Sequence, residues 1–169
     1  MISIKIIFFS VLMAIMYGIL HDMVTAHICV EYFTIGHPKI IESESPFVLA
    51  LTWGTIATWW VGLPMGILIA LFSRLGKRPK LELAPVMKLV FKLMSVMFVL
   101  ALLAGIIGFI LAENSMIHLI SHLAERMGES VHTNFLAVAW AHMASYISGI
   151  IGTFVLCRII YVRRKSMTH

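Results

Sequence analysis

Three uninterrupted hydrophobic stretches constrain this chain more than any other feature of its sequence. No charged residue occurs in Phe47–Phe72, Leu93–Ala112 or Phe135–Cys157, although the third stretch contains His142. A bilayer has a hydrocarbon core of about 30 Å, which a helix of about 20 apolar residues crosses. The composition agrees: 12% of the residues are charged, against about a quarter in soluble domains. Each stretch is therefore predicted to span a membrane.

The N-terminal segment is predicted to form a fourth span, although its outer end is less distinct. Ile6–Leu20 is apolar, and two histidines and two acids follow on what we expect to be the same helix. A cleaved signal peptide is the alternative, with Lys5 as its basic region and Val24-Thr25-Ala26 as the cleavage site. Cleavage would leave three spans. His21 and Asp22 are unusual before such a site, which favours a retained span.

These stretches predict an all-α fold, an integral membrane four-helix bundle in which residues 1–169 form a single transmembrane domain. The expected spans cover about residues 6–30, 47–72, 90–112 and 134–160, with a short interfacial helix over about residues 115–127. The lipid bilayer is the expected surrounding. A homo-oligomer or a membrane partner subunit stays open.

Basic residues predict the orientation of the spans. All but Lys39 and Arg126 of the 13 lysines and arginines flank the spans on one face, which the positive-inside rule makes cytoplasmic. Both termini are then cytoplasmic, and every acid except Glu82 lies at or beyond the outer ends of the spans. Because the positive charges sit in blocks beside the spans, the net charge of +5 does not indicate nucleic-acid binding.

The histidines are concentrated in the predicted outer half of the molecule, and only His169 lies elsewhere. Their spacing suggests metal ligands, because side chains three or four residues apart share a helix face. One pair is His27 and Glu31; a second set, on the predicted interfacial helix, is His118, His122 and Glu125. This shallow group is equally compatible with an ordinary polar surface.

A deeper group is harder to explain as surface. At about 1.5 Å of rise per residue, His21 and Asp22 are expected several Å below the outer boundary, and His142 about 10 Å deep. An ionisable group at such depth is costly unless it is paired, hydrated or coordinated. We therefore expect these three residues to meet inside the bundle, with hydrogen bonds from Thr25, Ser145 and Tyr146.

The leading functional hypothesis is a metal-binding membrane protein whose site opens to the outer side. Imidazole and carboxylate ligands suit Zn, Fe, Mn or Cu. The candidate ligands are His21, Asp22, His27, Glu31, His118, His122, Glu125 and His142. One alternative is a b-type haem held by His21 and His142 in an electron-transfer protein, and another is a non-catalytic accessory or scaffold subunit. His37, next to Pro38, is interpreted as a loop residue. The 12 methionines are interpreted as packing.

Two segments resemble a family of small, uncharacterised bacterial integral membrane proteins. The first is HDMVTAHICVEYFTIGHP, residues 21–38, and the second is LTWGTIATWWVG, residues 51–62. The resemblance covers roughly the first half of the chain. It implies the bacterial cytoplasmic membrane and the four-span plan, and it assigns no activity and no site residue.

Overall fold

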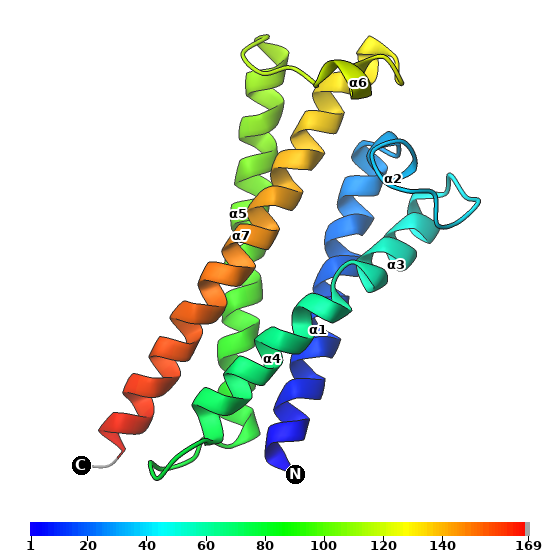
Figure 1. Cartoon of the computed structure of the whole chain (residues 1–169). Helices are drawn as coiled ribbons and strands as arrows, with labels where there is room; N and C mark the ends of the chain where they lie inside the picture. The colour runs from blue at the N-terminus through cyan, green and yellow to red at the C-terminus, as the bar shows by residue number, and fades with distance from the viewer. Residues whose placement is uncertain (168–169) are drawn as a thin grey trace.

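Helices make up most of the chain. The computed structural model describes residues 1–167, and this part of the chain contains helices and no strand (Figure 1). Four helical segments are long and apolar enough to cross a membrane, which confirms the predicted number of spans. They are α1 (Ile2–Ile28), the pair α3 (Pro46–Ile56) and α4 (Trp59–Arg74), α5 (Leu83–Glu113) and α7 (Glu129–Ser166). Two single-turn helices, α2 (Glu31–Thr34) and α6 (Ser121–Ala124), lie in the connections.

One predicted helix ends earlier than expected, and another begins later. Helix α1 ends at Ile28 because Cys29 adopts an extended conformation, so His27 and Glu31 belong to different helices. The helix predicted over residues 115–127 is present only as α6, since the extended backbone of Ile120 delays its start to Ser121. His118 therefore precedes α6 and does not share a helix face with His122. His169 lies outside the described residues.

The spans form two antiparallel pairs. Helix α1 packs against α3 and α4, and α5 packs against α7 along most of their length (Figure 1). Near the ends that carry the two termini, the pairs share one core in which Ile6, Val86 and Ile160 are fully buried. Toward the opposite end the pairs diverge (Figure 1). A cavity lies between the two pairs, lined by residues of α1, α4, α5 and α7 among others.

Glycines bring α1 close to its partners. A Cβ atom on Gly62 would lie 2.7 Å from Cβ of Ala14, and one on Gly54 would lie 2.5 Å from the backbone nitrogen of Ile19. Small residues allow helix backbones to approach where lipid provides no hydrophobic driving force. The second crossing lies less than one turn from His21, so it sets the position of that side chain relative to α3.

The second span is interrupted, but not at its proline. The break between α3 and α4 falls at Ala57 and Thr58, whereas Pro64 lies inside α4. The hydroxyl of Thr58 donates a hydrogen bond to the carbonyl of Gly54, at 2.5 Å. A side-chain donor thus satisfies a backbone acceptor beside the break, as membrane helices require where their own ladder is interrupted.

Arg164 holds the connection between α4 and α5 against α7. It is 5% exposed, and its guanidinium donates hydrogen bonds to four backbone carbonyls, those of Phe72, Leu75, Arg78 and Pro79. The planar guanidinium has five N–H donors and can therefore reach several carbonyls at once. The single ammonium group of lysine cannot make the same set of hydrogen bonds. The end of α7 is thereby joined to the end of α4 and to the loop that leads to α5.

Candidate metal centre

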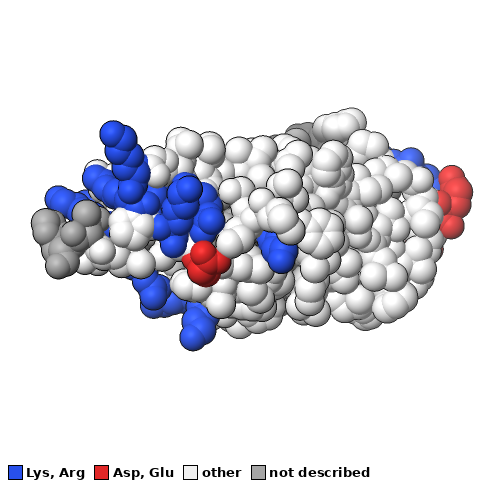
Figure 2. Space-filling model, turned by 90° about the horizontal axis from the view of Figure 1, so that it is seen from below, with Lys and Arg blue, Asp and Glu red and all other residues white. Residues whose placement is uncertain are grey.

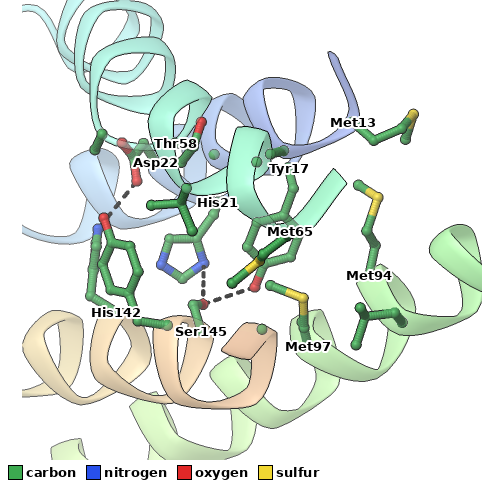
Figure 3. Close-up of a pocket in the computed structure, with 18 of the residues that line it drawn as sticks. Met13, Tyr17, His21, Asp22, Thr58, Met65, Met94, Met97, His142 and Ser145 are labelled. Carbon is green, nitrogen blue, oxygen red and sulfur yellow. Dashed lines mark hydrogen bonds and ion pairs between the residues drawn. The ribbon is translucent and has the colours of Figure 1, made fainter. Parts of the chain in front are cut away.

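Three buried ionisable residues converge between α1 and α7. Helix α1 supplies His21 and Asp22, and α7 supplies His142; the three residues are only 5–9% exposed. One potential ligand atom from each lies within 4.8 Å of the other two (Figure 3). The structure therefore brings together the deep group expected from the sequence, in an arrangement that can hold a metal ion.

Asp22 and His142 are directly paired. Oδ1 of Asp22 lies 3.2 Å from Nε2 of His142, while Nδ1 of His142 lies 3.0 Å from the carbonyl oxygen of Val138. A carbonyl only accepts hydrogen bonds, so Nδ1 carries the proton and Nε2 faces the carboxyl group. Between Nε2 and Asp22 there must then be either a proton or another cation.

His21 has one nitrogen without a partner. Its Nδ1 lies 3.5 Å from the hydroxyl of Ser145, which in turn lies 2.8 Å from the hydroxyl of Tyr17. Its Nε2 is buried and has no hydrogen-bond partner among the described residues. Leaving a buried polar atom unsatisfied costs about 1–3 kcal/mol. A bound ligand at this nitrogen would remove that cost.

The three residues border a narrow cavity of about 130 Å³ between the two helix pairs. Its outer end is lined by Tyr32, His37 and Trp53. The ring of Tyr32 lies 4.5 Å from that of His142, and the His37 ring lies 4.9 Å from that of Trp53. Burial raises the pKa of Tyr32 above its ordinary value, so this aromatic residue covers the site as a neutral phenol.

The other predicted ligands are not brought into this group. His27 is exposed and donates through Nδ1 to the carbonyl of Met23, at 2.6 Å. Glu31 accepts a long hydrogen bond of 3.5 Å from the thiol of Cys29. The remaining three predicted ligands, all exposed, are His118, His122 and Glu125. Within residues 1–167, the group formed by His21, Asp22 and His142 is the one with three converging metal-ligand side chains.

Sequence reasoning missed several polar residues of the cavity, among them Tyr17 and His37. Tyr17 lies one turn before His21, and this spacing could have identified it. His37 was interpreted as a loop residue, yet its Nδ1 donates to the carbonyl of Tyr32 at 2.8 Å and its ring lines the cavity. Of the expected hydrogen-bond donors, Ser145 contacts the His21 ring, whereas the Thr25 hydroxyl donates to the backbone carbonyl of His21.

The haem alternative is not favoured by this geometry. The His21 and His142 rings lie edge to face with their centroids 4.5 Å apart, so they contact each other directly. Two axial histidines need an iron and a macrocycle between them. The cavity of about 130 Å³ is also smaller than the roughly 300 Å³ or more of pockets for drug-sized ligands. A haem would require the two helices to separate.

Comparisons of the chain with protein-family models, curated proteins and solved structures found no match.

Proposed function

We propose that this chain is a metal-binding protein of the bacterial cytoplasmic membrane, with a site formed by His21, Asp22 and His142 in the outer half of the bilayer. The observation that carries the proposal is the convergence of these three buried ligand atoms within 4.8 Å. Two imidazoles and one carboxylate suit a first-row transition metal such as Zn, Fe, Mn or Cu.

The hydrogen bonds around the site support coordination. A metal-bound histidine usually donates its other ring N–H to a carbonyl or carboxylate, which orients the ring. His142 donates Nδ1–H to Val138, which leaves Nε2 directed at Asp22. His21 can adopt the same arrangement, because its Nδ1 lies beside Ser145 and its Nε2 has no hydrogen-bond partner among the described residues. Both imidazoles thus present Nε2 as the potential ligand.

Coordination requires a small closure of the site. Metal–nitrogen bonds are about 2.0–2.1 Å long, so two ligands on one ion lie at most about 4 Å apart. The present separations reach 4.8 Å. Side-chain rotation of less than about 1 Å at the ligand atoms closes this difference. The remaining coordination positions face the cavity, where water or a further side chain can occupy them.

The charge distribution supports the proposed orientation with both termini cytoplasmic. Lysine and arginine side chains gather around the end of the bundle that carries the termini and the α4–α5 connection (Figure 2). Acidic residues other than Glu82 lie in the opposite half. In this orientation α6 lies near the outer interface, and the cavity mouth at His37 and Trp53 faces the outer side. If α1 were instead cleaved at Ala26, His21 and Asp22 would be lost.

We further propose that the chain is a member of the uncharacterised bacterial family that residues 21–38 and 51–62 resemble. Five side chains from the first of these segments line the cavity, namely His21, Asp22, Tyr32, Phe33 and His37. A ligand site built largely from one continuous segment gives a physical reason for its distinctive sequence.

Metal titration of detergent-purified protein tests the proposed site. Co²⁺ reports coordination through its visible absorption, and elemental analysis gives the stoichiometry. We expect one ion per chain in the wild type and its loss in His142→Ala and Asp22→Asn. The matched controls His118→Ala and His122→Ala replace exposed histidines and should bind as the wild type does. Absence of stoichiometric metal, or binding unchanged by His142→Ala, would overturn the proposal.

A further inference from the structure

The cavity continues beyond the metal centre, and the chemistry of its lining changes along its length. Past the hydrogen bond between Tyr17 and Ser145, four methionines border it. They come from three helices: Met13 from α1, Met65 from α4, and Met94 and Met97 from α5. Figure 3 shows their sulfur atoms succeeding one another away from Asp22 and His142.

The four methionines lie at successive depths along the cavity. Counted from the helix ends on the side of the termini, they are about two and a half to four turns in, whereas His21 and Asp22 are about five turns in. Residues from separate helices therefore line the part of the cavity between the termini and the centre formed by His21, Asp22 and His142. We call this group of Met13, Met65, Met94 and Met97 the methionine layer.

Thioether sulfur is a neutral, soft ligand. Sites rich in methionine select Cu(I) over hard divalent ions. Methionine also fills irregular gaps in apolar cores, which is the ordinary interpretation of such residues. Met13 and Met94 also pack in the core near the termini, yet all four side chains border the cavity, and no acidic or basic residue other than those of the metal centre and His37 lines it.

We propose that the methionine layer is a Cu(I) site and that copper is the metal this protein takes. The inference rests on the proposed function, because the His21–Asp22–His142 centre would be the outer ligand set of the same cavity. Imidazole also suits copper, so the two ligand sets can hold the same ion in turn. Binding at either set involves no change of oxidation state.

Cu(I) competition titration against a chromophoric chelator, under reducing conditions, tests the methionine layer. All proteins carry Cys29→Ala and Cys157→Ala, so that no thiol supplies sulfur. The informative variant is Met94→Leu/Met97→Leu, which keeps side-chain volume and removes two thioethers. We expect its Cu(I) affinity to fall by at least about tenfold, since even residues that only orient a ligand cost 10–100-fold when lost. Its Co²⁺ binding should be unchanged.

The control is Met16→Leu/Met143→Leu, which removes two exposed methionines (45% and 60% exposed) and should leave Cu(I) binding as it was. Copper X-ray absorption provides a second measurement that does not depend on a variant: sulfur scatterers are expected in the Cu(I)-loaded protein. Wild-type Cu(I) affinity in Met94→Leu/Met97→Leu, or nitrogen and oxygen scatterers alone, would overturn the inference. Failure of the proposed function would give a different result from failure of this inference, because the wild type would then take up no Co²⁺.

Discussion

Asp22 and His142 lie 120 residues apart in the chain, yet Oδ1 of the first is 3.2 Å from Nε2 of the second. This contact joins the two helix pairs. Both side chains are buried. Without its partner, each would be an unsatisfied polar group in an apolar environment.

A double-mutant cycle measures this dependence. Asp22→Leu and His142→Phe each leave a buried polar partner behind, so each should reduce the free energy of unfolding by about 1–3 kcal/mol. The double variant removes both polar groups and should be less destabilised than the sum, with a coupling energy of about 1–3 kcal/mol. Reversible unfolding in mixed SDS and detergent micelles provides the values. Strict additivity would show that the two residues do not depend on each other.

The close crossing of α1 and α3 should not tolerate a methyl group. A Cβ at Gly54 would lie within 2.5–2.7 Å of the backbone of Gly18 and Ile19, and backbone cannot rotate away. Gly54→Ala should therefore destabilise the protein by about 1–3 kcal/mol, and it should weaken Co²⁺ binding by displacing His21. The measurements are SDS unfolding and Co²⁺ titration.

Gly105→Ala is the control for that substitution, because a Cβ there meets Ala141 and Ala137 at ordinary distances of 3.4 and 3.5 Å. It should unfold and bind Co²⁺ as the wild type does. Equal effects of the two glycine variants would contradict the proposed role of the crossing.

Arg164→Lys should loosen the connection between α4 and α5. The ammonium cannot reproduce the hydrogen bonds that the guanidinium makes to four carbonyls. Hydrogen bonds to charged groups contribute about 1.5–3 kcal/mol each, so a loss of about 2 kcal/mol or more is expected. Limited proteolysis near Lys77 and Arg78 should become faster. Arg163→Lys alters an exposed neighbour and should leave the stability and the proteolysis rate unchanged. Equal proteolysis rates in the two variants would contradict the proposed role of Arg164.

The thiol of Cys29 should react only at high pH. Burial is the main cause that raises its pKa from 9.0 to about 11, and alkylation proceeds through the thiolate. At pH 8 the thiolate fraction is then about one hundredfold lower than for an unperturbed thiol, and it rises as the pH approaches 11. Mass spectrometry of iodoacetamide labelling in Cys157→Ala measures the rate. Rapid labelling at pH 8 would contradict this prediction.

The expected meeting of the three deep residues is confirmed, and it followed from their depth in the bundle. His21, Asp22 and His142 were expected to meet because an ionisable side chain in hydrocarbon needs a partner, and the structure places them together. His118 and Glu125 were expected near the surface, where an ionisable side chain needs no partner, and both are exposed. Their predicted common helix depended on residues 115–120 being helical, which the extended Ile120 prevents.

The sequence by itself determined the spanning helices of this protein. In lipid each backbone must satisfy its own hydrogen bonds, so a long apolar run becomes a helix whatever surrounds it. Tertiary structure decided which faces of those helices meet. Contacts between residues far apart in the chain, which local sequence does not specify, produce three features of the structure. These are the helix crossing at Gly54, the position of His37 in the cavity lining and the methionine layer.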